Sequence, residues 1–228
     1  PGLVTNGGDI TVTGTSAGGV GVQLGDGTAF AIGSGGGAIT IDGTGIAAGV
    51  LMQGNQVASG GGAVSITGSG GDLGVSLDGS DIDSAGGDID IEGTATAASG
   101  AGVSLYDVQL TGGAGDVIVR GTAAGGIGIE FGYGSTISTT TGAIGLYGTG
   151  ADFGLDIADG ALDTDSGDIT LDGTATAATA IAGVRVTGPG LVTNGGDITV
   201  TGTSAGGVGV QLGDGTAFAI GSGGGAIT

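Results

Sequence analysis

The chain of 228 residues contains no cysteine, no histidine and no tryptophan, and its only basic residues are two arginines. Without histidine and cysteine, the usual general base, the thiol nucleophile and the transition-metal ligands are all missing. A pair of carboxylates could still hydrolyse glycosides, but such chemistry needs one asymmetric cleft, and no repeat carries a long loop to wall one. We therefore expect no enzyme, no catalytic residues and no cofactor-binding residues.

Positive charge is almost absent: 22 acidic residues oppose Arg120 and Arg185, a formal net charge of -20. Such a chain repels nucleic acid and anionic membrane surfaces, and its natural counterparts are cations. It also lacks an apolar run of transmembrane length and a recognisable signal peptide. The composition predicts no nucleic-acid partner and no membrane insertion of this segment.

What the chain does have is glycine, 62 residues of it. Glycine-rich chains are often collagen-like or disordered, but here there is no G-X-Y period. Ile, Val and Leu recur instead in short alternating runs, which disordered segments lack. The chain is therefore expected to fold.

The first forty residues return letter for letter as the last forty, so that 189–228 repeats 1–40. The copies agree even at glycines and surface-type positions that no fold would dictate. We interpret 1–228 as a single solenoid segment, slightly more than one 188-residue unit of a tandem array. On this interpretation Pro1 and Thr228 are expected to be cuts through a continuous filament.

A shorter period lies inside the unit, in the pattern G-x-[IV]-x-[ILV]-x-G-[TS] that begins at Gly8 and recurs every 25 to 29 residues. Alternation of apolar and polar residues over five positions predicts a strand, strand one of each repeat. The closing Gly-Thr or Gly-Ser is expected to form a turn that uses a positive φ. The unit then holds seven repeats, which begin at Gly8, Gly37, Gly62, Gly87, Gly115, Gly142 and Gly167.

Two further apolar signals follow in each repeat. A second strand is centred on Val22, Val50, Val75, Val103, Ile129, Leu155 and Val184. A third apolar anchor lies at Ile32, Val57, Ile82, Leu110, Ile137, Leu162 and Leu191. The anchor is always seven residues before the first apolar residue of the next strand one, so length variation falls mainly after strand one.

This separation of fixed and variable segments predicts an all-β fold, a right-handed parallel β-helix with three short strands per coil and about eight coils. Each strand would bond to its counterparts in the coils above and below, about 4.8 Å away. A β-propeller needs about 40 residues per blade, and a leucine-rich repeat needs a helix or an asparagine ladder, and neither is present.

Stacking places both arginines beside acids of the preceding coil: Arg120 beside Glu92, and Arg185 beside Asp156. The two pairs would help to set the register of the coils, since each exposed pair contributes only about 0.2 to 1 kcal/mol. Chance placement among 22 acids is the alternative.

Other acids stack without a counter-charge: Asp88 next to Asp116, and Asp168 next to Asp197. Stacked carboxylates are destabilising unless they are solvated or bridged by a cation. Two interpretations stay open, an acidic solvated face and a calcium site, although no known calcium-binding loop motif is present.

A column of hydroxyls follows strand one, and we interpret it as a stack that caps a turn. An ice-binding comb would need Thr-x-Thr in every coil, and that pattern breaks after the first. The column comprises residues 15, 44, 69, 94, 122, 149, 174 and 203.

The octets Gly-Asp-Ile-Thr-Val-Thr-Gly-Thr and Gly-Asp-Ile-Asp-Ile-Glu-Gly-Thr resemble the shaft repeats of large secreted bacterial adhesins of the filamentous-haemagglutinin and autotransporter type. The resemblance implies a structural shaft of a filamentous adhesin or extracellular fibre, located outside the cell or on its surface. The expected partners are further copies of the same repeat end to end; lateral self-association is left open, and the ligand at a tip stays unknown.

The alternative function is a solenoid surface that binds glycan or protein and is stabilised by calcium. A binding surface of that kind should expose an aromatic stripe. Tyr106, Tyr133, Tyr147 and Phe153 are not expected to stack as one, and Tyr147 is expected to be a surface packing residue. The shaft is therefore the preferred interpretation.

Overall fold

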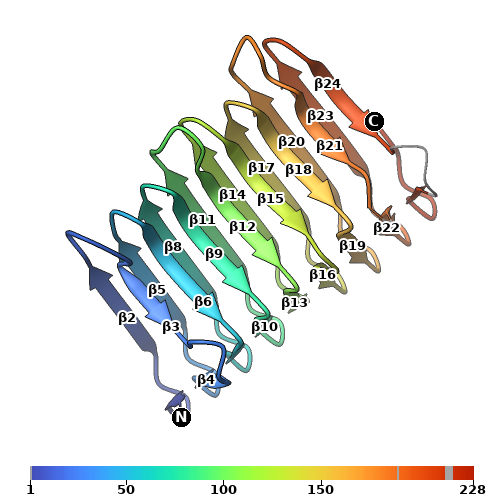
Figure 1. The fold of residues 1–228 in the computed structure, drawn as a ribbon. Helices are drawn as coiled ribbons and strands as arrows, with labels where there is room; N and C mark the ends of the chain where they lie inside the picture. The colour runs from blue at the N-terminus through green and yellow to red at the C-terminus, as the bar shows by residue number, and fades with distance from the viewer. Residues whose placement is uncertain (1, 189, 214–217) are drawn as a thin grey trace.

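The computed structural model describes residues 2–188, 190–213 and 218–228, and these form 25 strands and no helix. The strands lie in three parallel sheets that run the length of the molecule (Figure 1). Consecutive strands belong to different sheets, and each strand pairs with the third strand before and after it. The parallel β-solenoid with three strands per coil is thus confirmed. Among the described residues no helix could cross a membrane.

Sheet 1 contains the alternating octets. Its strands are β2 (Ile10–Thr15), β5 (Ile39–Thr44), β8 (Val64–Gly70), β11 (Ile89–Ala95), β14 (Val117–Ala123), β17 (Ile144–Gly150), β20 (Ile169–Ala175) and β23 (Ile198–Ser204). Inward residues are buried and outward ones are mostly exposed, as in the BeBeBiB pattern of β11. Alternation therefore buries one face of this sheet.

Sheet 2 contains the second predicted strand of each coil. Its strands are β3 (Val22–Leu24), β6 (Ala48–Gln53), β9 (Leu73–Asp78), β12 (Ala101–Tyr106), β15 (Ile127–Gly132), β18 (Phe153–Ala158), β21 (Ala182–Val186) and β24 (Val208–Leu212). The centres Val22, Val50 and Val75 pair in register, as predicted.

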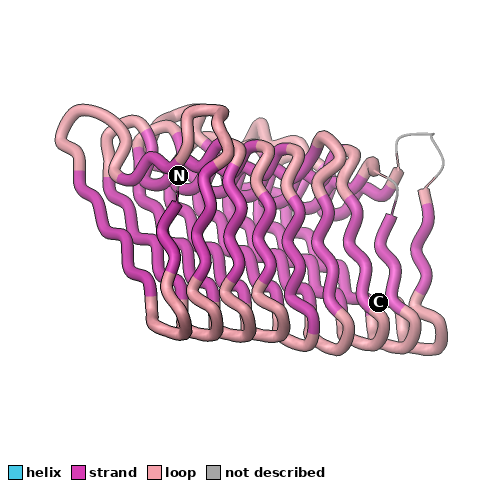
Figure 2. The backbone as a smooth tube through the Cα atoms, turned by 90° about the horizontal axis from the view of Figure 1, so that it is seen from below, coloured by secondary structure: helices cyan, strands magenta, loops and turns pink. Residues whose placement is uncertain are grey.

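Sheet 3 contains the third anchors. Its strands are β1 (Gly2–Val4), β4 (Phe30–Gly33), β7 (Asn55–Ala58), β10 (Asp81–Asp83), β13 (Gln109–Gly113), β16 (Thr136–Thr139), β19 (Ala161–Thr164), β22 (Gly190–Thr193) and β25 (Ala219–Gly221). Figure 2 shows the connecting turns gathered along the edges of the stack, with the strands running between them.

The core is a set of aliphatic columns contributed by all three sheets, including Ile39, Val50 and Ile82. One aromatic ring lies fully inside it, that of Phe131. A Cβ atom at Gly160 would collide with this ring, so the glycine leaves the space that the larger side chain fills. A narrow lumen accepts a ring only where a neighbouring residue gives up its side chain.

The prediction that the Gly-Thr end of strand one forms a turn is wrong. These glycines, such as Gly68 and Gly93, lie within the strands and have no positive φ. A Cβ at Gly68 would collide with the carbonyl of Gly74, and a Cβ at Gly93 with that of Gly102. Sheets 1 and 2 therefore converge until backbone packs on backbone, and glycine is required there by close approach rather than by a turn.

The hydroxyl column after strand one does not cap a turn. Thr15 and Thr44 are the last residues of their strands and point outward, exposed. A second column, which was not predicted from the sequence, fills that role two residues after each third anchor. The Ser34 hydroxyl donates a hydrogen bond to the carbonyl oxygen of Ser59 over 2.9 Å, and the Ser59 hydroxyl donates one to the carbonyl oxygen of Ser84 over 3.0 Å.

This buried hydroxyl ladder comprises Ser34, Ser59, Ser84, Thr139, Thr164 and Thr193. Hydrogen bonds satisfy backbone carbonyls at the corner between sheets 3 and 1, where an unpaired buried group would be costly. Gly112 occupies the equivalent position on β13, and the pairing of β13 with β16 shifts there between Thr111 and Gly113. The signal was present in the sequence as Ser or Thr at a constant distance from the anchor.

Of the forty repeated residues, Pro189 and 214–217 in the second copy and Pro1 in the first lie outside the described residues. The described parts of both copies adopt the same pairing. Leu3 pairs with Ile32, and Leu191 pairs with Ile220, 188 positions later in each strand.

Candidate functional site

The end of the stack is the first candidate surface, because the second copy of the repeat shows how one unit meets the next. Strands β22, β23 and β24 pair with β19, β20 and β21 of the seventh coil without a break in register. In the first copy, β1, β2 and β3 have a partner on one side only. The exposed fraction of Leu3 is accordingly 40%, whereas that of Leu191 is 0%.

The second candidate is the outward face of sheet 2 around Arg185. Its Nε and Nη2 atoms donate to the two carboxylate oxygens of Asp156 over 2.7 and 2.6 Å, so the predicted pair is confirmed. The guanidinium also lies 4.3 Å from the ring centroid of Phe153, a contact that the spacing of the repeats did not predict. Hydrogen bonding to Asp156 raises the pKa of Arg185 further above its usual value.

The outward face of sheet 1 carries Arg120. Its strand position pairs with Glu92, as predicted, but its guanidinium donates to Asp90 instead, with Nη1 2.7 Å from Oδ1. On the next strand Tyr147 occupies the same column, and its ring centroid lies 5.7 Å from the guanidinium carbon. Tyr147 packs over Gly145, where a Cβ would meet its ring, so it is the surface packing residue that was expected.

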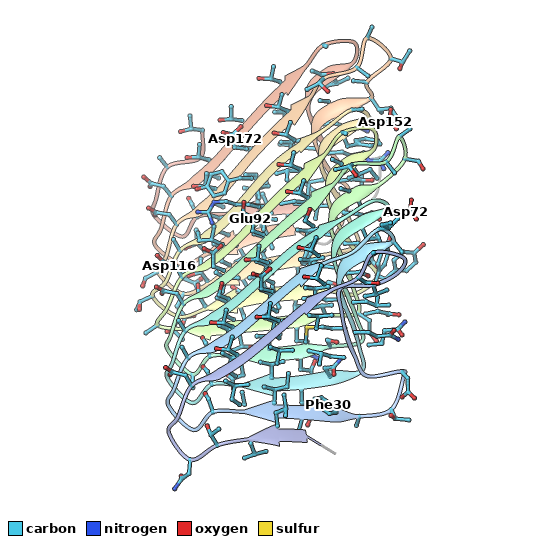
Figure 3. The ribbon with its side chains drawn as sticks, turned by 90° about the vertical axis from the view of Figure 1, so that its left-hand side faces the viewer. Phe30, Asp72, Glu92, Asp116, Asp152 and Asp172 are labelled. Carbon is cyan, nitrogen blue, oxygen red and sulfur yellow. The ribbon has the colours of Figure 1, made fainter. Side chains whose placement is uncertain are left out.

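Glu92 and Asp172 lie on this same face of sheet 1, one on either side of Arg120 and Tyr147 along the column (Figure 3). Asp116 precedes β14 at one end of the strands, while Asp72 and Asp152 follow β8 and β17 at the other end. Acidic side chains therefore line both edges of sheet 1.

The stacked aspartates form a ladder of hydrogen bonds between coils. Asp88 Oδ1 accepts the backbone N–H of Asp116 over 2.9 Å, and Asp168 Oδ1 accepts that of Asp197 over 2.8 Å. Asp9 accepts the N–H of Ala38 in the same way. Each carboxylate thus has one oxygen engaged with the next coil, which accounts for the stacking of like charges without a bridging ion.

Within residues 2–188, 190–213 and 218–228, no three acidic side chains come close enough together to hold a metal ion. The calcium site at Asp88/Asp116 and Asp168/Asp197 stays a prediction that these contacts do not test.

The remaining tyrosines form a pair that was not predicted from the sequence. Tyr106 ends β12 and Tyr133 follows β15, and their ring centroids lie 5.0 Å apart at an interplanar angle of 43°. Tyr106 pairs in register with Gly132, so Tyr133 reaches it from the residue after. The expectation that the four aromatics form no single stripe agrees with this geometry, but two of them do form a platform.

A groove of about 590 Å³ runs beside this platform on the outward face of sheet 2. Its floor includes Ser76 and Ser104, which are buried although they point outward. Its polar lining also includes Gln53 and three acids, Asp78, Asp107 and Glu130. A smaller hollow of about 220 Å³ lies on the other side of Tyr133, between Glu130 and Asp159. The Tyr133 side chain therefore separates two hollows that are lined by acidic residues.

The corner beneath the groove is held in a left-handed backbone conformation. Gly54 and Gly79 occupy it in the second and third coils with φ of 67° and 57°. The next three coils place Asp107, Tyr133 and Asp159 there, with φ of 51°, 54° and 63°. Non-glycine residues in this region are uncommon and cost about 1 to 2 kcal/mol each. Three side chains are thus presented at positions where glycine would fit with less strain.

The phenol of Tyr106 is held in its neutral form. Burial raises its pKa above the usual value of 10.0, and hydrogen bonding to Glu130 together with the charge of that residue raises it further. At neutral pH Tyr106 is therefore a hydrogen-bond donor next to a carboxylate.

No protein-family model, curated protein or solved structure matches this chain. The resemblance to adhesin shafts accordingly depends on the octets alone, and the case for a function depends on the geometry of the chain itself.

Proposed function

We propose that the chain is a structural repeat shaft of a secreted or cell-surface filamentous adhesin or extracellular fibre, without catalytic activity. The observation that supports this most strongly is the junction at β22, β23 and β24. There the second copy of the repeat continues all three sheets of the first unit in unbroken register.

Because the first copy has the same sequence as the second, it can accept a preceding seventh coil by the same contacts. Each unit presents the residues of β19, β20 and β21 at one end and those of β1, β2 and β3 at the other. Such a heterologous, head-to-tail contact does not close on itself and extends in one dimension. Seven coils at about 4.8 Å give roughly 34 Å of length per unit.

The surface suits an extended fibre as well. Acidic side chains project from several strands of sheet 1, such as Glu92 and Asp172, and a net charge of -20 favours solubility of a long filament. The extracellular location and the adhesin role are supported by the octet resemblance alone.

The test is to express arrays of one, two and four 188-residue units and to measure particle length by electron microscopy. We expect rods whose length grows by roughly 34 Å per added unit. Compact particles, or lengths that do not increase with unit number, would contradict the shaft. Antibody labelling of intact, unpermeabilised cells that produce the protein tests the surface location separately.

A further inference from the structure

We propose that the groove beside Tyr106 and Tyr133 binds the guanidinium group of an arginine from a basic partner segment. The groove would hold the cation between the face of the Tyr133 ring and the carboxylates that line it. This inference is independent of end-to-end assembly.

The same combination, a guanidinium group held by an aromatic ring and a carboxylate, occurs twice within the chain. Arg185 lies over the Phe153 ring and donates to Asp156, and Arg120 lies near the Tyr147 ring and donates to Asp90. In both clusters an aromatic ring and a carboxylate from a neighbouring strand surround one guanidinium. Cation–π contact and a charged hydrogen bond act together there.

The groove contains the same two components without the cation. Its aromatic part is the Tyr106–Tyr133 pair, and its acidic part comprises Asp78, Asp107 and Glu130. None of the residues that line the groove is basic. Because Tyr106 is uncharged at neutral pH and no lining residue is basic, nothing in the groove balances the negative charge of its carboxylates.

The exposed ring is Tyr133, at 73% relative exposure, far above the 37% of Tyr147. A surface ring with only a packing role would lie flat against the sheet, as the ring of Tyr147 does over Gly145. Tyr133 instead stands at a left-handed corner beside acidic hollows, and its ring stays largely exposed although the Tyr106 ring lies 5.0 Å away.

Charge decides which class of ligand fits. A neutral sugar could stack on a tyrosine, but it would leave several carboxylates uncompensated, and an anion would be repelled. A cationic group satisfies both the rings and the acids. Arginine is preferred over lysine because its planar guanidinium stacks on a ring and donates to a carboxylate at once.

A second copy of this chain is not a suitable partner. The sequence has only two arginines and no lysine, and both arginines already donate to a carboxylate in the same molecule. The arginine must therefore come from outside these 228 residues, in a segment basic enough to approach a surface with a net charge of -20.

The probe is a capped, extended peptide of alternating Arg and Gly, and its matched control is the same peptide with citrulline, a neutral isostere, in place of Arg. Calorimetric titration, together with tyrosine fluorescence, should show binding of the Arg peptide and at least about tenfold weaker binding of the citrulline peptide. Equal affinity for the two peptides would overturn the proposal.

The decisive variant is Tyr133→Gly, since glycine suits a φ of 54° and the fold should be retained. We expect affinity for the Arg peptide to fall about tenfold in Tyr133→Gly and also in Glu130→Gln. Tyr147→Ala, which removes a ring outside the groove, should leave the affinity unchanged. No loss in Tyr133→Gly would show that the peptide binds through net charge alone, and an equal loss in Tyr147→Ala would show that binding is not specific to the ring in the groove. Either result would overturn the site.

Discussion

Leu3 and Leu191 are the same residue of the 188-residue unit, paired to equivalent partners, yet one is 40% exposed and the other is fully buried. The difference is a neighbouring strand: Leu191 also pairs with Leu162 of the seventh coil. One molecule therefore shows the same side chain with and without a preceding coil, and so shows what end-to-end stacking buries.

This comparison predicts unequal effects of one substitution. Leu191→Ala should destabilise the last coils by about 3 kcal/mol, because it leaves a cavity in a closed core. Leu3→Ala should cost about 1 kcal/mol or less, since part of that side chain is already in water. Hydrogen exchange of the strands around each site measures the two costs separately, and equal losses of protection would contradict the prediction.

The glycine seam between sheets 1 and 2 predicts a sharp contrast between two Gly→Ala changes. At Gly93 the new Cβ would collide with the Gly102 carbonyl, which cannot move without shifting a strand, whereas at Gly195 it would meet nothing. We expect Gly93→Ala to lower the free energy of unfolding by about 3 kcal/mol or more. Gly195→Ala should stay within about 0.5 kcal/mol of the parent in urea unfolding. A neutral Gly93→Ala would mean that the two sheets do not approach each other so closely.

The two arginine pairs should differ in their contribution to stability. The side chains of Arg185 and Asp156 are 31% and 9% exposed, whereas those of Arg120 and Asp90 are 47% and 55% exposed. Arg185→Gln leaves a largely buried carboxylate without its partner and should cost about 1 to 3 kcal/mol. Arg120→Gln should change stability by less than about 0.5 kcal/mol. Thermal unfolding of the two variants at the same pH provides the comparison, and the opposite order would refute it.

Because the pKa of Tyr106 is raised, we expect its phenol to lose its proton at a higher pH than an ordinary tyrosine does. Its folded-state pKa lies above the usual value of 10.0, so the folded protein retains a proton that the unfolded chain loses. The resulting stabilisation is complete below pH 10 and declines as the pH rises above that value. Titration of tyrosinate absorbance should reveal one late phenol, which disappears in Tyr106→Phe and titrates earlier in Glu130→Gln. If the tyrosinate titration curve of Tyr106→Phe were identical to that of the parent, Tyr106 would not be the phenol with the raised pKa.

The aspartate ladder predicts how the protein responds to calcium. Since one oxygen of Asp88 and one of Asp168 already accept a backbone N–H, we expect millimolar calcium to raise the unfolding temperature no more than magnesium does. A rise specific to calcium, lost in Asp88→Asn, would establish a site at the Asp88/Asp116 stack instead.

The sequence was most informative wherever a constant spacing repeated. The seven-residue distance from each third anchor to the next strand one, and the alternation within the octets, were enough to align Ile39 with Val64. The apolar centres of the second strands aligned Arg185 with Asp156 in the same way. Register follows from such patterns because a slip of one residue would turn every apolar side chain of a strand outward.

The sequence was less informative about contacts between columns. Arg120 was expected beside Glu92 and does lie there in the register, yet its flexible side chain bonds Asp90 and lies near the ring of Tyr147. Strand register does not determine the conformation of a long side chain. The Tyr106–Tyr133 pair was missed for a related reason. The two rings are offset by one residue in the register, and only the left-handed backbone at Tyr133 brings them together.

The sequence alone therefore determined the solenoid, its three sheets and the stacking of coils, because period and alternation dictate which residues face inward and which strands become neighbours. Only the tertiary structure decided how closely sheets 1 and 2 approach each other and which hydroxyls form hydrogen bonds at the corner between sheets 3 and 1. It also decided that Arg120 pairs with Asp90 and that the rings of Tyr106 and Tyr133 are in contact. Those features depend on the distance between sheets and on side-chain and turn conformations, which no spacing along the chain encodes.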